Sequence, residues 1–328
     1  MRIVVITGGV GGARFLRGLA SLRTSESPLE ITAVVNTADD ITLHGLRVSP
    51  DLDTVMYTLG GGIDTDRGWG RQDETFHAQA ELAAYGAGPD WFGLGDRDLA
   101  THLIRTRMLD AGYGLTDVTA ALCARWDPGI TVLPMSDERV ETHVVVDIDG
   151  ERQALHFQEW WLRHQASLPA HEFSYVGAAE ALPAPGVIDA ILGSDIVLLA
   201  PSNPVVSIAP VLAVRGIRDA LVTRPTVGVS PIIGGAPVRG YADTCLKTIG
   251  VASDATAVGL HYGARTHGGL LDGWLVDTVD AGGVDALTSH GIAARALPLL
   301  MSDVDATAAI VAAALNLVEQ APAKNDAP

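Results

Sequence analysis

The sequence predicts an α/β protein with a doubly wound, mostly parallel Rossmann-like sheet and a helical and β-hairpin insertion. Three observations indicate this fold class. Strand-like runs at 2–7, 31–36, 195–200 and 226–230 are almost entirely apolar, as strands covered on both faces are. Helical patterns alternate with these runs, and the glycine-rich turn "TGGVGGARF" (7–15) joins the first strand to the first helix. Together they predict βαβ connections.

The helices of the first half follow from apolar spacing and helix-end signals. Phe15, Leu16 and Leu19 fall on one face of a helix after the glycine turn. Residues 73–126 indicate three consecutive helices, two ending at glycines and the third before Pro128. We expect these helices to form an insertion.

The second half begins with a change of pattern. From 130 to 162 apolar and polar residues alternate around Asp149-Gly150, which predicts an antiparallel hairpin. Trp160 and Trp161 are expected on alternate faces of its second strand. The sheet resumes near residue 195, and 306–318 form the last helix.

These elements predict how the chain is divided. Residues 1–65 and 180–320 form a Rossmann-like core that binds nucleotide or phosphate. Residues 66–179 form the insertion, which covers the active site. Residues 321–328, "APAKNDAP", are expected to be a disordered tail.

Composition narrows the function classes. With 22 basic and 39 acidic residues, a net charge of −17 makes nucleic acid and anionic membranes unfavourable partners. There is no run of eighteen apolar residues and no leader-like start, so we expect a cytoplasmic protein. Cys123 and Cys245 lie in apolar helical patterns, which indicates buried thiols in a reducing compartment. An acidic protein of this kind must bind a phosphorylated ligand through backbone N–H groups, a few arginines and a divalent cation.

The glycine-rich turn matches neither standard phosphate loop. It has no Lys-Ser/Thr, and Arg14 stands where a dinucleotide fingerprint has its third glycine. The backbone N–H groups of Gly9 to Gly12 can still converge on an anion at a helix N-terminus, and Arg14 adds positive charge. The alternative is a tight turn without a ligand, although a single glycine would suffice for that.

Acidic residues cluster after the second predicted strand. A strand that binds dinucleotides would end in Asp or Glu, and Asn36 stands there instead. Asp39, Asp40, Asp51 and Asp53 follow within "NTADD" and "SPDLDT". Carboxylates without nearby cysteine suit Mg²⁺, which takes one or two carboxylates plus substrate phosphates. The alternative is a set of helix caps and turns.

A second polar loop, "APSNPVVSI" (200–208), follows the apolar strand near 196–199. Ser202, Asn203 and Ser207 offer polar contacts at another helix start, or else cap a rigid turn. Two such loops on one sheet edge outline a crevice at a topological switch point. "LGDRD" places Arg97 at a helix start, as a ligand or as a solvated cap.

Eight motifs occur in order along the chain: "GGVGGARFL", "VVNTADD", "SPDLDTVMYTLGGGID", "LGDRDLATH", "LPMSD", "HFQEWW", "APSNPVVSI" and "SPIIGGAPVRG". On these motifs the sequence resembles the 2-phospho-L-lactate transferase family of coenzyme F420 biosynthesis, in a form similar to the actinobacterial phosphoenolpyruvate transferases. The resemblance implies a Mg²⁺-dependent homodimer. It also implies transfer of a phospho-acid from a guanylyl-activated donor to the ribityl chain of the deazariboflavin Fo, with release of GMP. Phosphoenolpyruvate and 2-phospho-L-lactate are not distinguished.

The resemblance also implies site residues. Phosphates would lie over Gly8, Gly9, Val10, Gly11 and Gly12 and the "PSNP" loop, with the metal at Asp40 and Asp53. Catalytic roles fall to Asp53 and Asp51, one of them as a base. The remaining substrate-binding residues are Arg14, Asn36, Arg97, Ser202 and Asn203. Two alternatives stay open, an NAD-dependent oxidoreductase and a non-catalytic nucleotide-sensing protein.

Overall fold

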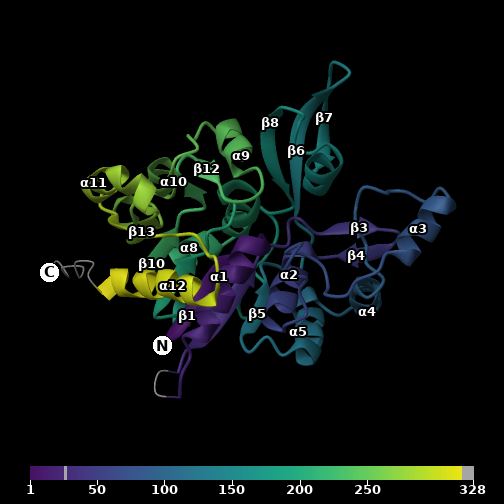
Figure 1. Ribbon diagram of the computed structural model, residues 1–328, viewed down its shortest axis with the longest axis horizontal. Coiled ribbons are helices and arrows are strands. Elements are labelled where there is room, and N and C mark those ends of the chain that lie inside the picture. Colours follow the sequence, from purple (N-terminus) through teal and green to yellow (C-terminus); the bar gives the residue numbers. More distant parts are fainter. Residues whose placement is uncertain (26–27, 320–328) are drawn as a thin grey trace.

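The computed structural model describes residues 1–25 and 28–319. Its centre is a seven-stranded, all-parallel sheet in the order β14-β13-β10-β9-β1-β2-β5 (Figure 1). The predicted fold class is therefore confirmed, whereas the predicted disordered tail at 321–328 lies outside the described residues. The strands are β1 (Arg2–Thr7), β2 (Glu30–Val35), β5 (Thr131–Pro134), β9 (Ile196–Leu199), β10 (Thr226–Val229), β13 (Gly273–Val276) and β14 (Ala293–Ala296).

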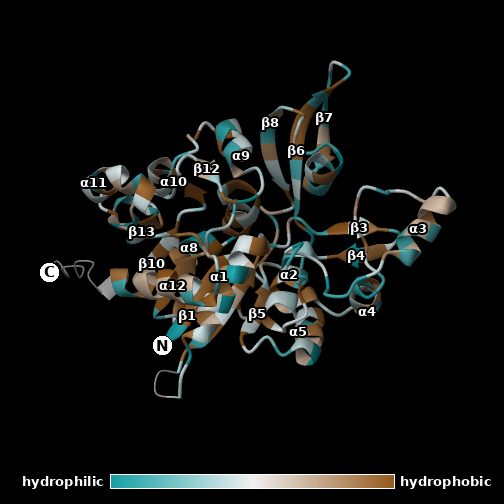
Figure 2. Cartoon of the chain, in the orientation of Figure 1, coloured by the Kyte–Doolittle hydropathy of each residue, from teal (hydrophilic) through white to brown (hydrophobic). Residues whose placement is uncertain are grey.

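Strand β1 shows why the central strands are apolar on both faces. Ile3 and Val5 belong to one hydrophobic cluster, and Val4 and Ile6 belong to the cluster on the other face. Successive side chains of a strand point to opposite faces, so a strand between two layers of helices must be apolar throughout. The brown central strands in Figure 2 show this pattern.

Helices cover both faces of the sheet. On one face α1 (Gly9–Ser21) packs against α12 (Val304–Glu319), the predicted last helix. A Cβ on Gly18 would lie 2.4 Å from Thr307 Cγ2, so this close helix crossing requires a glycine. The second half of the chain also contains α6 (Val187–Gly193), α7 (Ala209–Ala213), α8 (Ile217–Leu221), α9 (Ala242–Thr248), α10 (Ala255–Tyr262), α11 (Val284–Ser289) and the hairpin β11 (Ile232–Ile233) and β12 (Ala236–Pro237).

The three helices predicted within 73–126 are present as α3 (His77–Ala84), α4 (Asp98–Asp110) and α5 (Leu115–Trp126). They follow α2 (Pro50–Leu59) and the small hairpin of β3 (Ile41–Leu43) and β4 (Leu46–Val48). Together with β3 and β4, helices α3 and α4 extend away from the main sheet (Figure 1).

The predicted hairpin is present as β6 (Glu141–Ile148) and β7 (Glu151–His156), and β8 (Ala170–Val176) completes its sheet. Asp149 and Gly150 have φ of 52° and 83°, as a tight hairpin turn requires. Two expectations were wrong. Residues 131–134, which we placed in the antiparallel alternation, form β5, which pairs in parallel with β2. Trp160 and Trp161 lie in a π-helical turn, η1 (Glu159–Arg163), because the chain leaves the hairpin at His156.

Strands β13 and β14 were not predicted, and β14, "AARA", contains no run of large apolar residues that would indicate a buried strand. The division into a core (1–65 and 180–320) and an insertion (66–179) stays a prediction, and β5 of the main sheet falls within the latter range. Among the described residues, the helices lack the length and apolar character needed to span a bilayer.

Candidate active site

A cavity of about 440 Å³ lies where the chain leaves β1, β9 and β10. From β1 the sheet continues to β2 on one side, and from β9 to β10 on the other, so the cavity lies at a topological switch point. The predicted residues that line it are Gly8, Gly9, Val10, Gly11, Arg14, Asp51, Ser202 and Asn203. The predicted residues that do not line it are Gly12, Asn36, Asp40, Asp53 and Arg97.

The glycine loop packs tightly against its neighbours. A Cβ on Gly8 would lie 2.5 Å from Asp51 Oδ2, and one on Gly11 would lie 2.9 Å from the Pro201 carbonyl oxygen. Gly12 is buried behind the cavity wall, with Thr7 Oγ1 only 1.8 Å from a Cβ position. At each of these three positions a side chain would clash with a neighbour, so glycine is required. This close packing places the first turn of α1 at the cavity wall.

The second loop is joined directly to the first. The hydroxyl of Ser202 accepts the Gly8 N–H at 3.2 Å and donates to the Gly8 carbonyl at 2.7 Å. Asn203 accepts the Val205 N–H at 2.9 Å and so caps the π-helical turn η2 (Pro204–Ile208). The two predicted phosphate loops are thus one hydrogen-bonded unit.

Two buried carboxylates, Asp39 and Asp51, line the cavity beside this unit. Burial raises the pKa of Asp51 to about 6, although a hydrogen bond from Asn36 Nδ2 at 3.0 Å favours its ionised form. Burial and the nearby Asp51 raise the pKa of Asp39 well above its usual value. Within the described chain, Asp39 Oδ1 has no hydrogen-bond partner. Carboxylate oxygens that are buried in this way are suited to bind a cation.

Asn36 lies behind these carboxylates and is fully buried. Its amide nitrogen donates to Asp51 and to the Val206 carbonyl at 3.3 Å, and its oxygen accepts the Ala38 N–H at 3.0 Å. Because both of its N–H donors are used and its side chain is fully buried, Asn36 orients Asp51 and does not reach the cavity to bind the ribose of a dinucleotide.

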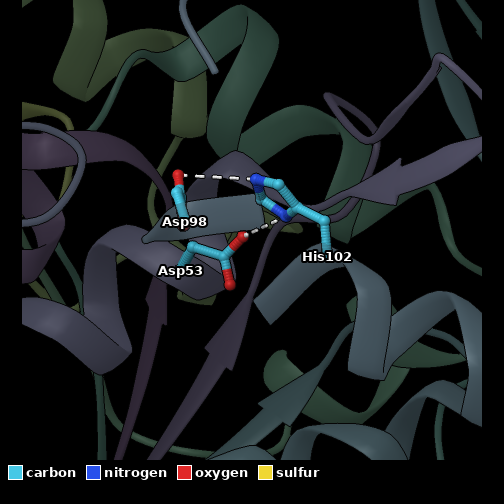
Figure 3. A group of neighbouring side chains, drawn as sticks. All are labelled: Asp53, Asp98 and His102. Atoms are coloured by element: carbon cyan, nitrogen blue, oxygen red, sulfur yellow. Dashed lines mark ion pairs between the residues drawn. The ribbon is translucent and has the colours of Figure 1, made fainter. Parts of the chain in front are cut away.

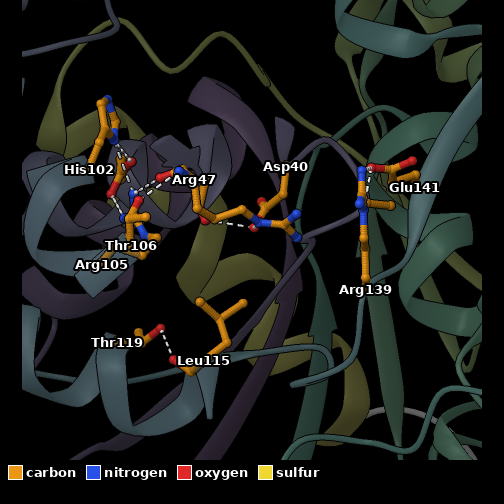
Figure 4. Close-up of polar contacts among 12 residues, drawn as sticks. Asp40, Arg47, His102, Arg105, Thr106, Leu115, Thr119, Arg139 and Glu141 are labelled. Carbon is orange, nitrogen blue, oxygen red and sulfur yellow. Dashed lines mark hydrogen bonds and ion pairs between the residues drawn. The ribbon is translucent and has the colours of Figure 1, made fainter. Parts of the chain in front are cut away.

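Asp40 faces away from the cavity toward the β3–β4 hairpin. It accepts the Ser49 hydroxyl at 2.6 Å and pairs with Arg47 Nε at 3.4 Å (Figure 4). Burial raises the pKa of Asp40 to about 6 despite the attraction of Arg47. Its contacts tie α2 to the hairpin.

Asp53 lies in a buried network between α2 and α4. It pairs with Arg105, and its second oxygen is 3.8 Å from His102 Nδ1 (Figure 3). His102 Nε2 is 3.4 Å from Asp98 Oδ2, and ligand atoms of Asp53, Asp98 and His102 lie within 4.8 Å of one another. Three residues that could hold a metal are therefore grouped here. However, Arg105 pairs with Asp53 and its Nη1 lies 3.1 Å from His102 Nδ1, so a cationic side chain already lies against two of these three residues.

Arg97 is exposed at the start of α4, where Nη1 donates to the Gln72 carbonyl at 3.2 Å. Arg239 lines the cavity and was not predicted as a site residue, although "SPIIGGAPVRG" contains it. Asp39 was predicted only as a member of the acidic cluster and not as a ligand. For Asp39 the missing information was the direction of the side chain, which two adjacent aspartates in a turn do not reveal.

Aromatic side chains form another wall of the cavity. Trp69, Trp91 and Phe92 come from the segment around α3, and Phe157 and Trp161 stack with ring centroids 5.4 Å apart. These residues are dispersed in the sequence, so no local pattern predicted their meeting. Flat apolar surfaces of this kind suit a planar ring as ligand.

Comparisons with known proteins agree over most of the chain. The family model described as "2-phospho-L-lactate transferase CofD" matches residues 3–290. A Streptomyces griseus protein named phosphoenolpyruvate transferase is 60% identical over 322 residues, covering 98% of this chain and 99% of its own. One of the same name from Mycolicibacterium smegmatis is 59% identical over 327 residues, covering 97% and 98%. The crystal structure of protein BH3568 from Bacillus halodurans, at 19% identity, has a TM-score of 0.62 over 96% of this chain and 99% of that one, and shows the fold alone.

Proposed function

This chain belongs to the 2-phospho-L-lactate transferase family, and from that premise we propose that it is a transferase of coenzyme F420 biosynthesis. It moves a phospho-acid from a guanylyl-activated donor to the ribityl hydroxyl of the deazariboflavin Fo and releases GMP. The name shared by its relatives favours phosphoenolpyruvate over 2-phospho-L-lactate as the acid. The observation that carries the proposal is a single cavity that combines a helix N-terminus, two carboxylates and an aromatic wall.

The donor phosphates fit the first turn of α1. Its backbone N–H groups and its positive helix end favour an anion, and Arg14 on the same helix lines the cavity. Ser202 keeps the second loop against Gly8, so the two loops hold the donor in one position. Positioning and charge neutralisation are the main needs of phosphoryl transfer.

The residues present also fit Mg²⁺. Asp39 would hold it, with Asp51 beside it, because both carboxylates line the cavity and Asp39 Oδ1 has no hydrogen-bond partner among the described residues. The metal assignment to Asp40 and Asp53 stays a prediction, and the arginine partners of these two residues favour Asp39 instead. When bound, Mg²⁺ neutralises charge on the phosphates.

The acceptor must lose one proton. The hydroxyl oxygen forms a bond to the phosphorus of the phospho-acid, the bond from that phosphorus to the GMP oxygen breaks, and the hydroxyl proton leaves. Asp51 is the aspartate of "SPDLDT" that reaches the cavity, and its pKa of about 6 suits a proton acceptor near neutral pH. The deazaflavin ring would lie on the aromatic wall.

Incubation with Fo, Mg²⁺ and each guanylylated acid tests the proposal. We expect GMP release and a product heavier than Fo by the phospho-acid less one water, measured by mass spectrometry, with Asp51→Asn as the inactive control. Absence of both GMP and product with either donor would refute the transferase assignment. A shift of melting temperature with NAD instead of the donor would favour the oxidoreductase alternative, which the buried Asn36 disfavours.

We also propose that the protein is a homodimer and acts on small molecules only. Leu103 and Ile104 of α4 are 50% and 45% exposed, and such adjacent apolar side chains favour an interface between copies. Light scattering after gel filtration measures the mass directly.

A further inference from the structure

Arg239 joins two segments that both line the cavity. It follows the hairpin of β11 and β12, and its Nη2 donates to the carbonyl of Arg67 at 2.7 Å. Arg67 belongs to the segment 64–70, which contributes Trp69 to the cavity wall. The guanidinium of Arg239 is therefore placed by a backbone acceptor from a distant part of the chain.

The same guanidinium packs against the glycine loop. Gly68 has a φ of +75°, and a Cβ there would lie 2.5 Å from Arg239 Nη1 and 3.4 Å from Val10 Cγ1. Gly68, Arg239 and Val10 thus meet at one point, next to the first turn of α1. A side chain at position 68 would displace the guanidinium.

The positive charge of Arg239 indicates the kind of ligand that it could bind. In the described chain, the cationic residues lining the cavity are Arg14 and Arg239, in a protein of net charge −17. A guanidinium has five N–H donors, and the hydrogen bond to Arg67 uses one of them. The remaining donors suit the paired oxygens of a phosphate, which arginine binds in a bidentate way.

We propose that Arg239 is a further substrate-binding residue, which grips a phosphate of the donor beside the N-terminus of α1. This inference rests on the proposed function and adds to it a second cationic contact, from a different loop than Arg14. It also gives Gly68 a role, since a residue without a side chain leaves room for the guanidinium.

The first experiment removes the charge. Dissociation constants for GDP, inorganic pyrophosphate and guanosine are measured by calorimetry for the wild type, Arg239→Gln and the control Arg152→Gln. Arg152 lies on β7 with a 71% exposed side chain, so its loss changes the net charge equally but far from the cavity wall. We expect Arg239→Gln to weaken GDP and pyrophosphate at least about tenfold and guanosine less than about twofold. Arg152→Gln should bind all three as the wild type does.

The second experiment moves the guanidinium without removing it. Gly68→Ala should weaken pyrophosphate binding and raise the KM for the donor, because the added methyl group displaces Arg239. Gly70→Ala is the matched control, because Gly70 has a φ of +68° in the same segment and no atom within 4 Å of its Cβ position. Both variants carry the same backbone strain, so only the displacement differs.

Four results would overturn the inference. Equal losses for guanosine and GDP in Arg239→Gln would show a general effect on the fold, and unchanged binding would remove the contact altogether. Equal effects of Gly68→Ala and Gly70→Ala would show backbone strain alone. If the wild type binds pyrophosphate but not GDP, the guanylylated donor is wrong while the role of Arg239 stands. If it binds neither, both proposals fail.

Discussion

Asp51 and Asp53 stand two positions apart in the first turn of α2, yet their surroundings differ. Asp51 reaches the cavity and is oriented by an amide, whereas Asp53 lies behind the wall against Arg105. Helical geometry separates positions i and i+2 by about 200°, so neighbours in sequence can serve different purposes. A substitution at each residue separates these purposes.

Asp51→Asn should abolish activity without loss of stability. The pKa of Asp51 is raised to about 6, so its ionised form is unfavourable in the folded state. The folded state therefore favours the protonated carboxyl. This stabilisation is fully present below the unfolded pKa, near pH 4, and is lost as pH rises through about 6. As pH rises from about 4 to 7, we therefore expect the free energy of unfolding of the metal-free variant to increase relative to that of the wild type by roughly 2–3 kcal/mol. Chemical denaturation across this range measures the gain, and a constant difference would contradict it.

Asp53→Asn should destabilise the protein. Arg105 is 1% exposed, and loss of its partner leaves a buried charge unpaired, which costs about 3–5 kcal/mol. The double variant Asp53→Leu with Arg105→Met should recover most of the melting temperature and a single-turnover rate within about tenfold of wild type. A folded double variant slower by a hundredfold would restore the catalytic role that the sequence suggested for Asp53.

At the scale of elements, the two loops after β1 and β9 depend on each other. Gly11 has the Pro201 carbonyl 2.9 Å from its Cβ position, so Gly11→Ala should push the loops apart, costing about 1–3 kcal/mol and weakening the donor. Gly282→Ala is the control, since nothing lies within 4 Å of its Cβ position. Thermal unfolding and GDP titration of both variants check this. Equal behaviour of the two would mean that Gly11 is only a turn residue.

Elements with strong local patterns were predictable, and those fixed by distant contacts were not. β1, the helices of 73–126 and the Asp149-Gly150 turn each carry their own signal. Strand β14, "AARA", is defined only by pairing with β13. The site divides in the same way. The two predicted phosphate loops and Asp51 follow strands, whereas Arg239 and the aromatic wall reach the cavity through tertiary packing.

For the whole molecule, the excess of acidic residues sets the strongest requirement. A protein of net charge −17, with Asp39 and Asp51 at the cavity, must screen charge to bind an anionic donor. We expect EDTA to abolish turnover and Mg²⁺ to restore it, with Mn²⁺ as a substitute. Turnover in chelator equal to that with Mg²⁺ would exclude a metal requirement.

The two π-helical turns, η1 and η2, both border the cavity, through Trp160, Trp161, Val206 and Ser207. Such a turn holds about one residue more than an α-helical turn, and so it can lose one without breaking the helix. Deletion of a single residue would convert the turn to an α-helical one and redirect only the side chains within it, while the flanking elements keep their places. Evolution can therefore redirect the residues that face the substrate through a change of length, without exchanging any of the amino acids.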